Sequence, residues 1–170
     1  MIKRIAIVGP ECTGKSTLSA ELAQHFNSRW VPEFARTYLE NLNRPYIQSD
    51  LLEIAKGQLS WEEEQVAHAN RFLFCDTNLL VIKIWSEFKY QSTDQEILKL
   101  WQSKNYALHL LTDIDIPWED DPQREHPEKR AQLFEIYREH LLKENISYIH
   151  IKGSKTERLQ EAIRAIEKLS

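Results

Sequence analysis

The sequence predicts an α/β protein whose parallel sheet is covered by helices on both faces. Short apolar runs typical of buried strands alternate along the chain with longer segments of helical spacing. Such alternation favours a parallel sheet, in which a helix carries the chain from one strand to the next. The first strand and helix are joined by a glycine-rich loop of the kind that binds phosphate.

The predicted elements follow one another in a regular order. The first strand is expected at residues 5–8, and the first helix at 16–26, where Leu18, Leu22 and Phe26 share one face. Ligands of parallel sheets bind where the strands end, so the residues after each strand are the first candidates for a site. Further strands are expected at 29–32, 71–75, 107–111 and 148–151, and further helices at 51–69, 95–101, 131–142 and 157–169.

Length, charge and cysteine usage limit the function classes. The 170 residues suggest one domain over residues 1–170, and a net charge of −4 argues against nucleic acid as a partner. No apolar run is long enough to span a membrane, and a strand begins at the N-terminus, so neither a membrane partner nor a signal peptide is expected. Cys12 and Cys75 resemble reduced thiols of a cytoplasmic protein. Protein partners stay open.

Residues 9–17 match the phosphate-binding pattern G-x-x-x-x-G-K-[ST] in full. Backbone N–H groups of residues 11–15 would surround phosphate oxygens, helped by the positive end of the next helix. Lys15 would reach the β- and γ-phosphates, and the Ser16 hydroxyl would ligate Mg²⁺. The nucleotide ligands predicted here are Gly9, Glu11, Cys12, Thr13, Gly14, Lys15, Ser16 and Thr17.

Asp76 directly follows the third predicted strand. Phosphate-loop proteins place there the acid that organises Mg²⁺, so we expect Asp76 to form the metal site with Ser16. The structural alternative is a helix N-cap, because an apolar run follows Asp76 closely. One residue could do both.

Glu33 follows the second predicted strand and should face the same edge of the sheet. A carboxylate there could orient and deprotonate an acceptor hydroxyl, which makes Glu33 the first choice for a catalytic base and Asp76 the alternative. Arg36, one helical turn later, could bind phosphate or pair with Glu33. The structural alternative is a surface ion pair in the first turn of a helix.

Residues 113–130 are rich in Asp, Pro and Glu and are predicted to form a mobile lid over the site. A guanidinium on such a lid would stabilise the negative charge of a transferring phosphoryl group, and the closed lid would exclude water. Arg124 is the expected group, with Arg130 as a weaker candidate. The alternative is an ordinary charged loop.

Aromatic residues are dense near the expected strand ends. Aromatic rings hold a flat and especially a cationic substrate well. Spacing leaves open which rings would form the slot, and Tyr38, Trp85 and Trp118 are the expected acceptor contacts. The rings whose segments could approach the strand ends are Trp30, Tyr38, Trp61, Trp85 and Trp118. Gly153 follows the last strand, and residues 152–156 could wrap an adenine or form a plain turn.

Four sequence blocks occur in the order and spacing of a known family. They are the loop at 9–17, Val31-Pro32-Glu33-Phe34-Ala35-Arg36, Asp76-Thr77 with Trp85, and Pro117-Trp118 with Arg124. Together they resemble the nicotinamide riboside kinase family of bacterial P-loop kinases, which includes the kinase half of a bifunctional NAD-biosynthesis and regulatory protein. The resemblance covers nearly the whole chain. It implies a three-layer α/β/α fold with a mostly parallel five-stranded sheet of order 2-3-1-4-5.

The resemblance also implies an activity, which is ATP-dependent phosphorylation of the riboside 5′-hydroxyl to give nicotinamide mononucleotide, with Mg²⁺. Glu33 would then hold the ribose, Asp76 would serve Mg²⁺ and Arg124 would be the lid arginine. Three alternatives remain: a kinase for another nucleoside or small alcohol, an ATPase switch without an acceptor, and an NAD-sensing binding module that has lost catalysis.

Two positions depart from the family pattern. The family usually has a second acid two residues after Asp76, where this chain has Asn78. Its lid usually reads Asp-Gly before the arginine, whereas Asp121-Pro122-Gln123 precedes Arg124 here, and proline stiffens that backbone.

Overall fold

A parallel sheet forms the centre of the computed structural model, which describes residues 1–169; the last residue of the expected domain 1–170 lies outside them. The strands of the described chain pair in the order β2-β3-β1-β4-β5, and every pair is parallel. This order confirms the prediction, and each strand lies within two residues of its expected place. The strands are β1 (Lys3–Val8), β2 (Arg29–Val31), β3 (Phe72–Asp76), β4 (Leu108–Thr112) and β5 (Tyr148–Ile151).

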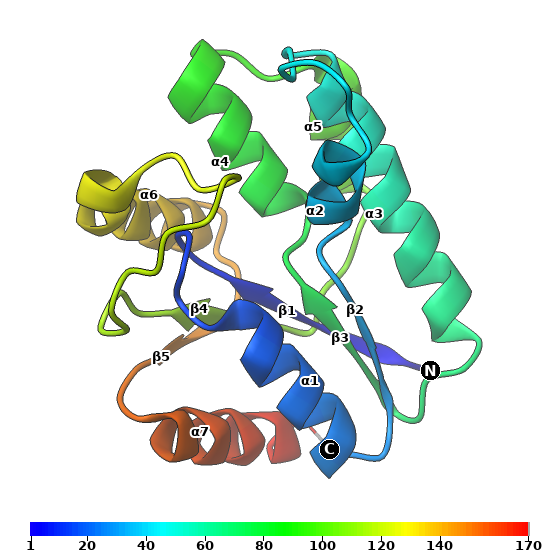
Figure 1. The fold of residues 1–170 in the computed structure, drawn as a ribbon. Coiled ribbons are helices and arrows are strands. Elements are labelled where there is room, and N and C mark those ends of the chain that lie inside the picture. The colour runs from blue at the N-terminus through cyan, green and yellow to red at the C-terminus, as the bar shows by residue number, and fades with distance from the viewer. Residues whose placement is uncertain (170) are drawn as a thin grey trace.

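Helices cover the sheet on both faces and complete the three layers (Figure 1). Two of them, α1 (Lys15–His25) and α7 (Lys155–Glu167), pack on one face through a cluster that contains Leu18, Leu22 and Ile166. The other face buries a larger apolar cluster. The helices of that face are α2 (Phe34–Glu40), α3 (Asp50–Val66), α4 (Leu79–Tyr90), α5 (Gln95–Gln102) and α6 (Arg130–Lys143), the last preceded by a 3₁₀ turn, Pro127–Lys129.

Helix α4 was not predicted as a helix. The helix begins with four consecutive apolar residues at 79–82, a short run that is as typical of a strand as of a helix, and Leu79, Leu80 and Ile84 are buried. The cap of this helix is Asn78, whose side chain accepts a hydrogen bond from the Leu80 N–H at 3.1 Å. The capping role considered for Asp76 therefore belongs to Asn78, two residues later.

Helix α2 packs closely on α3 because α3 has a glycine at the contact. A Cβ on Gly57 would lie 2.1 Å from Cε1 of the Phe34 ring, so a larger residue would push the ring away. The Phe34 N–H also donates to the Gln58 side chain at 3.0 Å. Phe34 comes directly after Glu33, so this packing fixes the position of a predicted site residue.

A buried arginine on α7 joins the ends of β4 and β5 to the loop after β1. Arg158 is 4% exposed and donates to the backbone oxygens of Thr13 at 2.6 Å, Gly153 at 3.0 Å and Asp113 at 3.0 Å. It also pairs with the Asp115 carboxylate. The planar guanidinium can serve several acceptors at once, which a lysine could not do with the same geometry.

Arg158→Met should lower the free energy of unfolding by about 2–4 kcal/mol, because several buried acceptors lose their donor together. Arg164→Met on the same helix is the matched control, since Arg164 pairs with the exposed Glu161. The control should stay within about 0.5 kcal/mol of the parent. Denaturant unfolding of both variants tests this, and equal stabilities would contradict the bracing role of Arg158.

Candidate functional site

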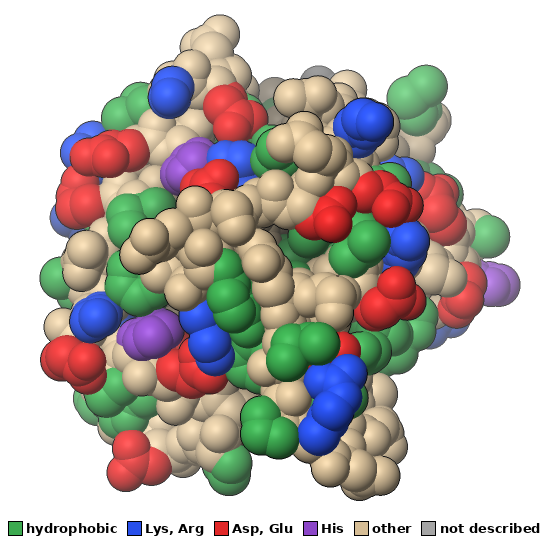
Figure 2. Space-filling model, turned by 90° about the horizontal axis from the view of Figure 1, so that it is seen from above, with side chains coloured by type: hydrophobic (Ala, Val, Ile, Leu, Met, Phe, Trp, Pro, Cys, Tyr) green, Lys and Arg blue, Asp and Glu red, His purple; other side chains and the backbone are tan. Residues whose placement is uncertain are grey.

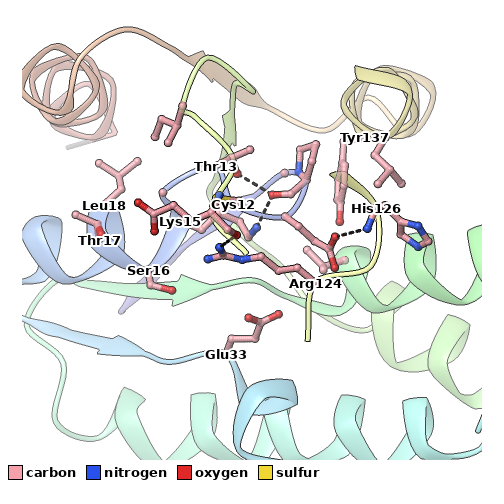
Figure 3. Close-up of a pocket in the computed structure, with 18 of the residues that line it drawn as sticks. Cys12, Thr13, Lys15, Ser16, Thr17, Leu18, Glu33, Arg124, His126 and Tyr137 are labelled. Atoms are coloured by element: carbon pink, nitrogen blue, oxygen red, sulfur yellow. Dashed lines mark hydrogen bonds between the residues drawn. The ribbon is translucent and has the colours of Figure 1, made fainter. Parts of the chain in front are cut away.

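A cavity of about 640 Å³ lies at the carboxyl ends of the strands, between the loop after β1, α2, α4 and residues 115–126 (Figure 3). Its volume is in the range of small-molecule sites, and it stands where ligands of parallel sheets bind. It brings together most of the predicted residues. These lining residues are Gly9, Glu11, Cys12, Thr13, Gly14, Lys15, Ser16, Thr17, Glu33, Arg36, Trp85, Arg124 and Gly153.

The backbone of the phosphate loop needs its two glycines. Gly9 has φ 146° and Gly14 has φ 79°, in the region that favours glycine. A Cβ on Gly9 would also lie 2.5 Å from the Thr112 hydroxyl oxygen. That hydroxyl is 2.7 Å from the Thr13 hydroxyl, which is itself 2.8 Å from the Pro10 carbonyl. The loop is therefore held in shape by β4 and by its own side chain.

Lys15 is the first residue of α1 and folds back over the loop, where its ammonium donates to the Pro10 carbonyl at 2.7 Å. The first turn of α1 has no acidic side chain, so its free N–H groups and the ammonium present positive charge to the cavity. This arrangement suits phosphate oxygens.

Asp76 is 2% exposed and lies beside the start of α1. One carboxylate oxygen accepts from the Ser16 hydroxyl at 2.5 Å, and the other is buried without any partner. Burial raises the pKa of Asp76, against the opposing effects of the Ser16 hydrogen bond and the Lys15 charge. A buried carboxylate oxygen that lacks a donor fits a nearby cation.

Residues Ser16 and Asp76 therefore fit Mg²⁺ as partial ligands. No group of three or more His, Cys, Asp or Glu side chains within residues 1–169 could hold a metal ion. A magnesium ion at this place would take its other ligands from phosphate oxygens and water, as is usual for Mg²⁺.

Glu33 lines the wall of the cavity that lies opposite Lys15 and Arg124 (Figure 3). Burial raises its pKa; the Lys15 charge lowers it, and the neighbouring Asp76 carboxylate raises it further. Arg36 also lines the cavity, but it pairs with Asp121 at 3.0 Å, so the simple pairing with Glu33 considered above is not the contact that forms.

Residues 113–130 cross the mouth of the cavity. The Arg124 side chain reaches across toward Lys15, and its guanidinium donates to the Glu119 carbonyl (Figure 3). Arg130 has a different place: it donates to the carbonyls of Cys12 at 3.1 Å and Ile116 at 2.8 Å, which fastens the segment to the phosphate loop.

The predicted acceptor aromatics are separated by the fold. Trp85 lines the cavity, whereas Tyr38 and Trp118 are not among the lining residues. The Tyr38 hydroxyl donates to Asp50 at 2.7 Å, and the Trp118 ring faces the Arg124 guanidinium at 5.9 Å. Several lining residues were not predicted, because no motif marks them. The packing of helices brings Phe88, Leu133, Tyr137 and Arg158 to the cavity, and the segment 113–130 brings His126.

Gly153 stands at the far end of the cavity, after β5. Its N–H donates to the Asp115 carboxylate at 2.6 Å, and its φ of 95° again favours glycine. Ser154 then caps α7 through a capping box with Glu157. The turn is thus fixed from both sides.

The outer surface shows no strong preference for one charge where it can be seen. Figure 2 shows Lys and Arg side chains interspersed with Asp and Glu on the face viewed from above. Within residues 1–169, the helices are too short or too polar to cross a membrane.

Comparisons with known proteins agree with this fold. The chain is 28% identical over 160 residues to the trifunctional NAD biosynthesis/regulator protein NadR of Salmonella typhimurium, which covers 89% of this chain and 38% of NadR. Structures of NadR with NR, and with NAD and AMP-PNP, give TM-scores of 0.82 and 0.81 at 22% and 20% identity, each covering 99% of this chain and 49% of theirs.

A deoxyadenosine kinase from M. mycoides shares the fold at a TM-score of 0.67 and 13% identity, over 97% of this chain and 99% of that one. The predicted resemblance to the NAD-biosynthesis regulator is confirmed, and this chain spans less than half of the length of the regulator. A family model described as AAA domain matches residues 4–158. The chain therefore belongs to this AAA domain family of P-loop proteins.

Proposed function

We propose that this protein is a kinase that transfers the γ-phosphoryl group of ATP to the 5′-hydroxyl of nicotinamide riboside, giving nicotinamide mononucleotide. One observation carries the proposal: a single cavity joins the phosphate loop to a second wall with Glu33 and Trp85. A hydrolytic switch needs only the first half. The relatives whose names or titles mention NAD biosynthesis, NR and deoxyadenosine kinase support an acceptor of nucleoside type.

The roles of the residues follow from their places. Residues 9–17 would bind the triphosphate. Lys15 and Arg124 both line the cavity, and the Arg124 side chain reaches toward Lys15 (Figure 3), so the two would stabilise the transferring group. Ser16 and Asp76 would hold Mg²⁺, which would supply positive charge against the phosphate oxygens. Residues 113–130 would act as the lid, and Gly153 would contact the adenine.

Glu33 is the proposed base and ribose ligand. Its raised pKa reflects burial of a charge, and a cationic acceptor beside it would offset part of that cost. Nicotinamide riboside carries a positive pyridinium ring, and Trp85 offers an aromatic wall to such a ring. Arg36 would complete this side. Tyr38 and Trp118, which the fold places outside the lining, are not part of the proposal.

The proposal treats residues 1–170 as one kinase domain. Cys12 and Cys75 are both free, which supports action in the reducing cytoplasm.

The decisive assay offers ATP with nicotinamide riboside, deoxynucleosides and a thiamine-like alcohol in turn, and identifies products by mass. We expect nicotinamide mononucleotide and little ATP consumption without acceptor. Product from another acceptor but none from the riboside would make the named substrate wrong, and acceptor-independent hydrolysis would favour a switch.

Lys15→Ala should lower kcat at least about 100-fold, because the charge that develops in the transition state loses the ammonium that stabilises it. Lys56→Ala, which removes one member of an exposed ion pair, should have no effect on kcat.

Asp76→Asn should abolish the effect of Mg²⁺ on nucleotide binding. In the parent, Mg²⁺ should tighten binding of AMP-PNP about tenfold or more, a gain that the neutral amide would lose. The substitution removes a buried charge, so the midpoint of thermal unfolding should not fall. Calorimetric titration with and without Mg²⁺ measures this, and an unchanged Mg²⁺ effect would show that the metal does not bind at Asp76.

A further inference from the structure

Glu125 is the point at which the segment over the cavity is held from the donor side. Its backbone N–H donates to both oxygens of the Glu11 carboxylate, at 3.2 and 3.1 Å, and the next N–H, of His126, donates to the same carboxylate at 3.1 Å. Figure 3 marks this last contact. Glu11 belongs to the phosphate loop, so its side chain leaves the loop to fasten the segment above it.

The side chain of Glu125 is held from the acceptor side. Its carboxylate accepts from the Tyr46 hydroxyl at 2.9 Å and from the Lys89 ammonium at 3.2 Å. The same hydroxyl accepts from the Trp85 indole N–H at 3.0 Å and from Lys89. Trp85 and Lys89 lie on α4, and Tyr46 lies in the loop between α2 and α3. The Trp85 ring, which lines the cavity, packs edge-on against Tyr46 with centroids 5.0 Å apart.

These two sets of contacts meet only in the segment itself. No hydrogen bond or ion pair within residues 1–169 joins Glu11 directly to Tyr46 or Lys89, and both sides contact Glu125. Arg124 is the residue immediately before Glu125, so an anchor on Glu125 also fixes the backbone from which the guanidinium extends. The ion pair between Arg36 and Asp121 is a second contact that joins this segment to the acceptor side of the cavity.

We propose that Glu11, Tyr46 and Lys89 are positioning residues that lock Glu125 from both sides, aligning Arg124 and coupling the donor half of the cavity to the acceptor half. The alignment of Arg124 for phosphoryl transfer rests on the proposed kinase activity. The anchoring of Glu125 from both sides does not depend on that activity. A single ion pair at a partly exposed place would contribute little to the free energy of folding. Here the Glu125 carboxylate accepts from a hydroxyl and an ammonium, while the N–H groups of Glu125 and His126 donate to Glu11, so the contacts form a network.

Amide hydrogen exchange tests the shared anchor without any substrate. Tyr46→Phe and Lys89→Met touch neither Glu11 nor His126, yet both should speed exchange of the Glu125 and His126 N–H groups by about tenfold, as Glu11→Gln does directly. Lys56→Met, which removes an exposed ion pair at a similar 3.2 Å with Glu96, is the matched control and should change nothing there. Exchange in β3 should stay as in the parent for every variant, which excludes general destabilisation.

The kinetic arm tests the alignment of Arg124. Each positioning variant should lower kcat about tenfold with little change in KM for ATP, and should raise the share of ATP lost to water. Lys89→Arg keeps the charge and reach, so it should restore most of the lost rate. Tyr46→Phe should also remove any gain in acceptor affinity that AMP-PNP produces in the parent.

The outcomes separate the two ideas. Faster His126 exchange in Tyr46→Phe without any turnover of nicotinamide riboside would support the shared anchor and reject the named substrate. Unchanged His126 exchange in Tyr46→Phe and Lys89→Met, with fast exchange only in Glu11→Gln, would mean that the two sides act independently and would overturn the inference.

Discussion

A buried carboxylate, Asp76, and a half-buried one, Glu33, lie beside the phosphate loop, and this pair is the constraint that organises the structure. Asp76 and Glu33 lie at the ends of adjacent strands, and loss of water raises the pKa of both. The Lys15 charge acts against this at each of them. Such burial weakens a fold unless a ligand uses it. The free oxygen of Asp76 and the position of Glu33 opposite the loop are the reasons for proposing a cation and an acceptor hydroxyl as occupants.

The parallel register of β1, β2 and β3 brings the ends of these strands to one edge of the sheet, where the cavity lies. Ile7 pairs with Asp76 across β1 and β3, and Val31 pairs with Cys75 across β2 and β3, so the phosphate loop, Asp76 and Glu33 reach one edge of the sheet together. The Gly9 backbone approaches Thr112 too closely for a side chain, and Arg158 braces the same loop from α7. The phosphate-loop side of the cavity is therefore held by β4 and α7, while the opposite side is formed by helices α2 and α4 and by the segment that contains Glu125.

Sequence reasoning located what short-range patterns determine. The strands, the phosphate loop, Asp76 and Glu33 follow from local motifs and their positions at strand ends, and the fold agrees with the predicted class and order. It could not locate α4, because the short apolar run at residues 79–82 with which the helix begins does not distinguish a helix from a strand. Nor could it locate the bracing Arg158, which looks like any charged residue of an amphipathic helix. The separation of Trp85 from Tyr38 and Trp118 depends on how helices pack, which spacing alone does not reveal.

The most direct test is a crystal structure with AMP-PNP, Mg²⁺ and nicotinamide riboside bound. We expect the triphosphate on residues 9–17 and the riboside between Glu33 and Trp85, with its 5′-oxygen about 3–3.5 Å from the γ-phosphorus and within hydrogen-bonding distance of Glu33. A riboside bound away from Glu33, or a saturated nucleotide site with an empty acceptor half at high riboside concentration, would contradict the account.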